Sequence, residues 1–270
     1  ENTVLGADFQ YRNSNFLGDQ VVQTDFFYER SFSNTFGDDD SFGMALTLPN
    51  EPWGGRLTFK QVGEDFRPAL GFANRRGIRR YEGRLINRYR YRDRFIRQAI
   101  FAAEGEYITG LDNRPQNFES DLSIEIETYA NDRAWVDLRN YYERVPELFT
   151  LPRDVPVSLG DYNWTNFGFR FQTSGARSVQ FRVDAECCSF YNGDSFQIEA
   201  GINWRPNRYF EFQPGYEATY ISLPSGSVDI HILTLDSVLN FTPDMQLAIE
   251  VQWDNTSQAF AFSGRYIWEY

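Results

Sequence analysis

The sequence predicts an all-β protein, specifically a transmembrane antiparallel up-and-down β-barrel, and three observations support this fold class. Apolar and polar residues alternate along one segment after another, as in strands with one wet face. Aromatic residues make up 17% of the 270 residues, yet the mean hydropathy is negative. No segment approaches the ~20 apolar residues that a membrane-spanning helix requires. A barrel wall between lipid and a wet lumen has this composition.

Period-two alternation defines the individual strands. In residues 245–254 the odd positions are apolar and the even positions are polar or alanine, and residues 179–186 and 196–205 also alternate. The alternation changes phase near residues 99, 167 and 234, so those three strands would each need a β-bulge. In all we predict about fifteen strands, centred near residues 7, 25, 45, 59, 86, 99, 125, 138, 167, 182, 200, 215, 234, 249 and 265.

Connection lengths predict a membrane orientation, because outer-membrane barrels combine short periplasmic turns with longer outside loops. Short turns fall at every second connection, at residues 130–134, 173–177, 205–208 and 242–244. Long connections are expected at residues 65–77, 107–120 and 143–161.

No repeat, low-complexity tract or linker is evident, so we expect a single β-barrel domain over residues 1–270. A soluble β-sandwich, whose strands also alternate, is the alternative fold.

An odd number of strands predicts that this chain is part of a larger barrel. The strands near residues 7 and 265 then run in the same direction, which places Glu1 on the outer side and Tyr270 on the periplasmic side. Bacterial single-chain barrels normally have an even strand number. We therefore expect other segments of the same protein, or another chain, to complete the wall. The aromatic segment at residues 260–270 resembles a closing strand and favours the opposite conclusion.

Charge and residue types exclude several function classes. The net charge of −12 argues against a nucleic-acid partner, which a basic surface would bind. His231 is the only histidine, so a Ser/His/acid site would have to use it, and a histidine-rich metal site cannot form. We expect His231 to be an ordinary strand residue, and the protein to be no enzyme and to carry no cofactor or metal. The adjacent Cys187 and Cys188 are expected to be unpaired thiols, because neighbouring strand residues point to opposite faces.

The most informative stretch is residues 75–97, with ten arginines and only two acids, Glu82 and Asp93. On a strand, alternate residues share a face, which separates the arginines from Tyr81, Gly83, Leu85, Tyr89 and Tyr91. Arginine facing lipid costs ~2–4 kcal/mol near the membrane midplane. The sequence therefore predicts that the tyrosine face meets the membrane and that the lumen is lined by Arg80, Arg84, Arg88, Arg90 and Arg92, with Glu82 among them.

Two roles are open for these arginines. They could form an anion-selective or polyol-binding wall, since charged rings set selectivity in pores. Alternatively they neutralise carboxylates on neighbouring strands, such as Glu125, Glu127, Asp184 and Glu186, because buried charge is normally paired. A second charged feature, the acidic run at residues 38–40, is predicted to be a solvated outside loop. Calcium binding there is the alternative.

Several segments resemble an outer-membrane family of unknown function in which a carbohydrate-binding family 9-like module precedes a C-terminal β-barrel. The matching segments are GADFQYR at residues 6–12, LPNEPW at 48–53, GEDFRPALGF at 63–72, RRGIR at 75–79 and QWDNTS at 252–257. The block RPALGF followed by RGI is the most specific. The resemblance implies an outer-membrane barrel, a glycan connection through the module that is absent here, and a longer protein on both sides of this chain. It implies no catalytic site.

Together these features predict a non-enzymatic β-barrel in the bacterial outer membrane that contacts its lipid. It would pass or bind a solute, either saccharide-like or anionic, through an arginine-lined lumen. The alternative is a structural barrel that anchors a larger outer-membrane or secretion assembly. An enzyme embedded in the barrel is the third possibility. An open lumen would favour transport, whereas a lumen filled by the loop at residues 143–161 would favour anchoring.

Overall fold

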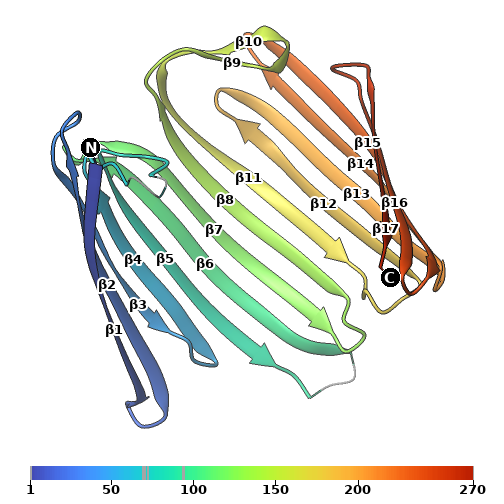
Figure 1. Ribbon diagram of the computed structural model, residues 1–270, viewed down its shortest axis with the longest axis horizontal. Coiled ribbons are helices and arrows are strands. Elements are labelled where there is room, and N and C mark those ends of the chain that lie inside the picture. The colour runs from blue at the N-terminus through green and yellow to red at the C-terminus, as the bar shows by residue number, and fades with distance from the viewer. Residues whose placement is uncertain (1, 69–70, 72, 93–94, 270) are drawn as a thin grey trace.

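Fifteen antiparallel strands form one sheet in the computed structural model, which describes residues 2–68, 71, 73–92 and 95–269. Each strand pairs with its neighbours in the chain (Figure 1). All fifteen predicted strands are present. They are β1 (Asn2–Phe16), β2 (Gln20–Ser33), β3 (Asp39–Leu48), β4 (Trp53–Val62), β5 (Ile78–Arg90), β6 (Ile96–Gly110), β7 (Pro115–Thr128), β8 (Arg133–Val145), β11 (Gly160–Gln172), β12 (Val179–Phe190), β13 (Gly193–Asn207), β14 (Phe210–Leu223), β15 (Gly226–Thr242), β16 (Met245–Asp254) and β17 (Phe260–Trp268).

The sheet is a curved wall. In Figure 1 the two end strands, β1 and β17, lie nearer the viewer than the paler middle strands, so the view is onto the concave side. Within the described residues, β1 and β17 are the two ends of the strand order and do not pair with each other. The chain ends also lie at opposite ends of the wall, as the odd strand number predicts. Glu1 and Tyr270 themselves are outside the described residues.

Alternation gives the wall one polar and one apolar face. On β7, Asp121 lies opposite Glu104 of β6 and Arg139 of β8 on the concave face. The next residue, Leu122, lies opposite Leu138 on the convex face, where it is 54% exposed. Because partners in an antiparallel ladder share a face, the same phase passes from strand to strand. A large, continuous and exposed apolar face is the mark of a surface that another apolar phase covers.

Aromatic side chains form a row near one end of the convex face. Ring centroids are 6.0 Å apart for Phe42 and Phe59, 5.1 Å for Phe59 and Tyr81, 6.2 Å for Tyr81 and Tyr107, and 6.3 Å for Tyr107 and Phe118. At ~3.4 Å per residue, Tyr89 lies about 27 Å from Tyr81 along tilted β5. With the ~35–45° tilt of barrel strands, this length spans roughly 20 Å along the membrane normal, close to the ~25 Å height of an apolar band between two aromatic girdles.

The three expected bulges have different outcomes. β6 does change register, between Ile96 and Gln98 and again between Ile108 and Thr109. β11 does not, since it pairs with β8 without interruption. Its change of phase arises because Tyr162 and Trp164 are aromatic residues on the concave face. In β15 the region near residue 234 is also regular, and the register shift lies at residues 240–242.

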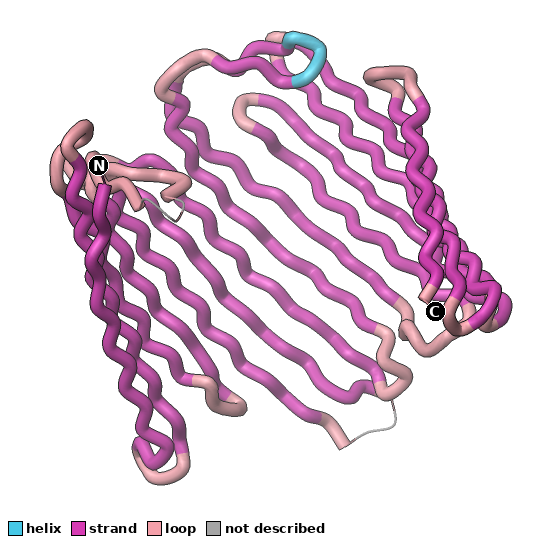
Figure 2. The backbone as a smooth tube through the Cα atoms, viewed as in Figure 1, coloured by secondary structure: helices cyan, strands magenta, loops and turns pink. Residues whose placement is uncertain are grey.

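Loops are confined to the two ends of the wall (Figure 2). Two of the expected long connections, at residues 65–77 and 143–161, are present as loops at residues 63–77 and 146–159 of the same end, and the four expected short turns lie at the other. The third expected long connection is wrong, because β6 and β7 extend until only residues 111–114 join them. The 63–77 loop carries the whole RPALGF block, of which Ala69, Leu70 and Phe72 lie outside the described residues.

Both long loops pack onto the wall through small apolar cores. The 146–159 loop contains β9 (Phe149–Leu151), the 3-10 turn η1 (Pro152–Asp154) and β10 (Val155–Val157), which sequence analysis did not predict. Its Val155 and Val157 are buried against Val228 of β15. Phe66 of the 63–77 loop is buried against β4, β5 and β6. Each loop is therefore fixed at its end of the wall.

Two local expectations are wrong. Asp39 and Asp40 begin β3 instead of lying in a solvated loop, and the Asp39 carboxylate accepts the backbone N–H of Asp65 at 2.8 Å. The acidic run therefore holds the 63–77 loop. Cys187 and Cys188 are joined by a disulfide, with their Cα atoms 3.3 Å apart, and are not free thiols. Strand alternation alone did not keep these adjacent side chains apart.

Among the described residues, Glu127 has the largest side chain that is almost completely buried, with 1% exposure. Its carboxylate accepts the amide of Gln98 at 2.5 Å and lies 3.4 Å from the guanidinium groups of Arg97 and Arg133. These partners come from the strands on both sides of β7. A buried carboxylate without partners would be costly, so Glu127 fixes the register of β6, β7 and β8 where β6 bulges.

Replacing Glu127 with Gln should lower the free energy of unfolding by about 1–2 kcal/mol, because charge-assisted hydrogen bonds are lost while the half-exposed arginines remain hydrated. Thermal and denaturant unfolding of the full-length protein in detergent would measure this change. Glu125→Gln is the matched control on the same strand face, where we expect less than about 0.5 kcal/mol. Equal effects of the two substitutions would show that Glu127 has no special role in the register.

Candidate functional site

The arginines of β5 lie where alternation predicts. Arg80, Arg84, Arg88 and Arg90 occupy alternate positions on the concave face, and cross-strand pairing places Arg84 opposite Glu104. Tyr81 and Tyr89 share the opposite face with Leu85, and Tyr89 is 58% exposed. The fifth predicted lumen residue, Arg92, and its neighbour Tyr91 follow the end of the strand at Arg90, so strand alternation does not orient them.

Glutamates on neighbouring elements pair with four of these arginines. Arg84 Nε lies 2.9 Å from Glu104 Oε1. Arg80 donates from Nε to Glu106 Oε2 at 2.7 Å and also lies 2.7 Å from Glu82. The second proposed role of the arginines, neutralisation of carboxylates, is therefore confirmed for these four arginines of β5.

For the arginines of β5 the expected carboxylate partners are wrong, and of the arginine-rich stretch only Arg97, on β6, is seen to pair with one of them, Glu127. Glu127 pairs with Arg97 and Arg133, and Asp184 pairs with Arg170. Glu186 pairs with Arg139, as described below. The reason is the strand order, since β5 touches only β4 and β6, whereas the four expected carboxylates lie on β7 and β12.

Glu51 holds the other end of β5. It lies in the turn between β3 and β4, where its carboxylate accepts hydrogen bonds from Arg90 at 2.8 and 2.9 Å and from Arg88. Hydrogen bonds from Arg90 and Arg88 lower the pKa of Glu51 from 4.5 to about 2. The Glu51 carboxylate therefore holds the turn at residues 49–52 against β5 through Arg88 and Arg90.

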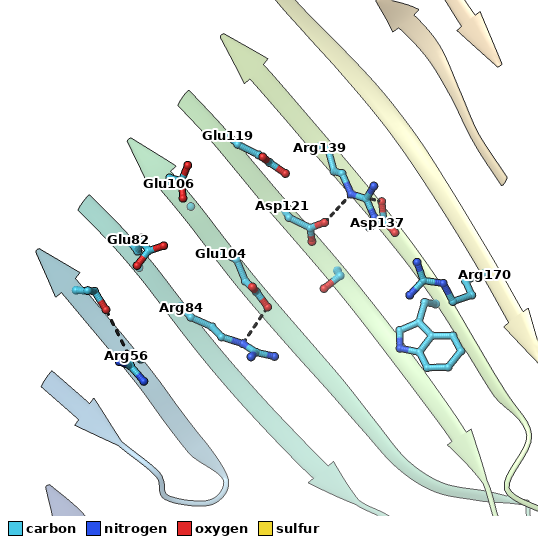
Figure 3. A pocket seen from close by; sticks show the side chains of 15 residues that line it. Arg56, Glu82, Arg84, Glu104, Glu106, Glu119, Asp121, Asp137, Arg139 and Arg170 are labelled. Carbon is cyan, nitrogen blue, oxygen red and sulfur yellow. Dashed lines mark hydrogen bonds and ion pairs between the residues drawn. The ribbon is translucent and has the colours of Figure 1, made fainter. Parts of the chain in front are cut away.

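Charged side chains surround a pocket of about 600 Å³ on the concave face (Figure 3). Every one of these side chains comes from a strand of the wall, β4 to β8 or β11, and neither long loop contributes. The lining residues are Arg56, Thr58, Glu82, Gly83, Arg84, Glu104, Gly105, Glu106, Glu119, Asp121, Ser123, Trp135, Asp137, Arg139 and Arg170.

Arg139 is the hub of the acidic side of this pocket. Its Nε lies 3.0 Å from Asp121 and 3.1 Å from Asp137, and its Nη1 lies 2.5 Å from Glu186. Asp137 fits because Gly168 lies opposite it, where a Cβ atom would come within 2.2 Å of the carboxylate. One guanidinium thus orders carboxylates from three strands.

The other side of the pocket is basic. Arg56 of β4 lies directly opposite Arg84 of β5, and its Nε donates to Thr58 Oγ1 at 3.3 Å. No carboxylate of the described residues lies within ion-pair distance of Arg56. The indole of Trp135 faces the pocket from β8, with the Arg170 guanidinium 5.7 Å from its ring centroid.

Sequence analysis missed Arg56, Trp135 and Arg139 as site residues. A signal was present in β8, where the odd positions from 133 to 143 read Arg, Trp, Asp, Arg, Tyr and Glu. That polar face resembles the arginine face of β5. Without the strand order, however, nothing in the sequence placed β8 near β4 and β5.

The described residues contain no helix that could span a membrane. Within the same ranges, no group of three or more His, Cys, Asp or Glu side chains could hold a metal ion. His231 is a strand residue, as expected, and lies on the convex face opposite Ala218, with its Nδ1 2.9 Å from the Tyr216 hydroxyl.

Replacing Glu51 with Gln should destabilise the protein at neutral pH but not at very low pH. The folded-state pKa of about 2 lies below the ordinary 4.5, so the stabilising effect of ionised Glu51 is complete above about pH 5 and is lost as the pH falls towards 2. Melting temperatures of both proteins in detergent should therefore differ near pH 7 and converge near pH 2. High salt should shrink the difference, because the pair is exposed. A difference that does not depend on pH would contradict this account.

No protein-family model and no curated protein matches the chain. Among solved structures the chain is similar to the "Copper transporter OprC", with a TM-score of 0.52 at 9% sequence identity. The match covers 95% of this chain and 55% of that one, so the chain spans little more than half of that protein's length. At this identity the similarity concerns the fold. The chain has the strand arrangement of an outer-membrane barrel wall.

Proposed function

We propose that this chain forms part of the wall of a non-enzymatic barrel in the outer membrane of a Gram-negative bacterium and that the barrel passes or binds a polar solute. The separation of the two faces carries this proposal. The convex face is apolar and bordered by aromatic residues, as lipid requires. The concave face is charged from β4 to β14, as a wet lumen requires, and it contains the pocket.

The chemistry of the pocket favours a saccharide-like solute over a simple anion. Trp135 offers a flat apolar surface for the C–H face of a sugar ring, and the guanidinium and carboxylate groups beside it offer donors and acceptors for hydroxyls. Arg80, Arg84, Arg88 and Arg90 are paired with glutamates, so they present ordered donors more than free positive charge. Arg56 is the basic side chain best placed to contact an anionic group of the solute.

Two observations support the remaining parts of the proposal. His231 lies on the face opposite the pocket, which leaves the pocket without an imidazole base and supports a non-enzymatic role. The outer edges of β1 and β17 have no partner strand among the described residues. Lipid cannot satisfy unpaired backbone groups, so we propose that further strands of the same protein, or of another chain, complete the wall.

Anchoring of a larger assembly is the alternative function. It would be favoured by a lumen filled by the 146–159 loop. That loop instead packs at one end of the wall on Val228 and its neighbours, and the pocket is lined by strand residues alone. The arrangement therefore favours passage of a solute, and the copper named for the structural neighbour is the cargo of that protein.

Reconstitution of the full-length protein in planar bilayers tests the transport role. We expect discrete conductance steps. Replacing Arg84, Arg88 and Arg90 with Gln should shift the reversal potential away from anions, because Glu51 and Glu104 then lose their counter-charges. Added maltooligosaccharides should block the current reversibly, and Trp135→Ala should weaken that block.

Arg144→Gln is the control, since Arg144 lies on the convex face and should leave selectivity unchanged. Absence of any conductance would sink the transport role and favour anchoring. Conductance with no oligosaccharide block would retain transport and remove the saccharide-like solute.

A further inference from the structure

A second aromatic surface lies on the concave face, in line with the pocket. Tyr141 follows Arg139 by two positions on β8, so alternation keeps both residues on this face. On β11, Trp164 lies directly opposite Tyr141, and the two rings stack with their centroids 5.1 Å apart and their planes 18° apart. Both residues are partly exposed. The stack lies nearer the long-loop end of β8 than the pocket tryptophan, Trp135.

Aromatic neighbours hold the Tyr141–Trp164 stack from one side. The Trp164 ring packs on Tyr191 at 4.9 Å and on Phe190 at 6.0 Å between ring centroids. Among the described residues, no aromatic ring packs against the side of Tyr141 that looks away from Trp164. That side is turned towards β7, where Glu119 is the residue directly opposite Tyr141. The stack therefore presents a fixed, flat apolar surface towards the pocket.

Glu119 connects this surface to the pocket, because it is exposed and belongs to the pocket lining. Its neighbours Glu106 and Asp121 each pair with an arginine, whereas no cation of the described residues lies within ion-pair distance of Glu119. A carboxylate in this state is free to accept hydrogen bonds. An aromatic ring beside such an acceptor suits a sugar, whose C–H face packs on the ring while its hydroxyls donate to the carboxylate.

The two aromatic surfaces are too far apart to contact the same sugar ring. Trp135 and Tyr141 lie six positions apart on one face of β8, which corresponds to ~20 Å at ~3.4 Å per residue. Polar side chains occupy the space between them, and Figure 3 shows Asp137 and Arg139 there, with Asp121 beside Arg139. A single sugar on Trp135 would leave Tyr141 uncovered, whereas an extended oligosaccharide contacts both aromatic surfaces and the polar groups between them.

We propose that Glu119 and the Tyr141–Trp164 stack form a second saccharide subsite, and that the solute is an oligosaccharide extended along the lumen from Tyr141 to Trp135. This inference rests on the proposed function, in which a saccharide-like solute contacts Trp135. The bases of a nucleic-acid strand could also stack on the two aromatic surfaces. The carboxylates around Tyr141 would repel its phosphates, however, and a neutral oligosaccharide meets no such repulsion.

Block of the ionic current by sugars of different length tests the second subsite. The probes are a disaccharide and a hexasaccharide from each of the malto, cello and chito series, added to the full-length protein in planar bilayers. In at least one series we expect the hexasaccharide to bind about tenfold more tightly than the disaccharide, because only the longer sugar reaches both aromatic surfaces.

Variants of Tyr141 separate ring stacking from other roles. Tyr141→Ala should remove the tenfold advantage of the hexasaccharide and leave the affinity for the disaccharide unchanged. Tyr141→Phe keeps the ring and should keep wild-type affinity for both sugars. The matched control is Tyr142→Ala, which removes the same type of side chain from the adjacent position on the convex face and should not affect either sugar.

The outcomes distinguish this inference from the proposed function. Equal affinity for the two lengths in the wild type, or an equal loss for both in Tyr141→Ala, would overturn the second subsite and leave the transport role standing. A loss in Tyr142→Ala or Tyr141→Phe as large as that in Tyr141→Ala would also overturn it. Conductance without block by any of these sugars would remove the saccharide-like solute and the subsite together. Absence of conductance would instead contradict the transport role itself.

Discussion

Backbone hydrogen bonding in lipid is the constraint on which the rest of the structure depends. A chain that crosses a membrane must pair its N–H and C=O groups within protein, and an antiparallel ladder does this for consecutive strands. The same ladder forces side chains to alternate between two faces. Because a slip of one residue would exchange the faces of a whole strand, the charge of the concave face and the apolarity of the convex face together hold the register. Glu127 does so where the bulge of β6 would otherwise permit slippage.

Arginine suits this wall for a related reason. Neighbouring strands lie ~4.8 Å apart. An arginine on the concave face can therefore reach a carboxylate that lies opposite it on the adjacent strand. The planar guanidinium can reach two or three carboxylates at once, as Arg139 does for Asp121, Asp137 and Glu186. Charges compensated so locally make a rigid polar surface. Arg56, which has no carboxylate within ion-pair distance among the described residues, is the arginine that we assign to the solute.

Alternation predicted the number of strands, the face of each residue on β5 and the opposite placement of the chain ends, because these are properties of single strands and of their order. It did not predict the partners of the arginines, since partners depend on register between strands. The prediction of a bulge in β11 was also wrong, because the aromatic side chains of Tyr162 and Trp164 lie on the polar face and change the phase of the alternation. These residues point inward, where Trp164 stacks on Tyr141 and both Tyr162 and Trp164 pack against Tyr191, an arrangement formed by residues distant in the sequence. The pocket was missed for the same reason, as its lining comes from six strands.

Site-directed spin labelling along β7 tests most directly whether the concave face is wet and the convex face meets lipid. Single cysteines at residues 118–126, in a full-length protein with Cys187 and Cys188 replaced by serine, would each carry a nitroxide. Relaxation by oxygen, which concentrates in lipid, would be compared with relaxation by a water-soluble nickel chelate. The account predicts a period of two, with Leu122, Ile124 and Ile126 accessible to oxygen and Asp121, Ser123 and Glu125 accessible to the chelate. A reversed phase, or access of the chelate to both sets, would contradict it.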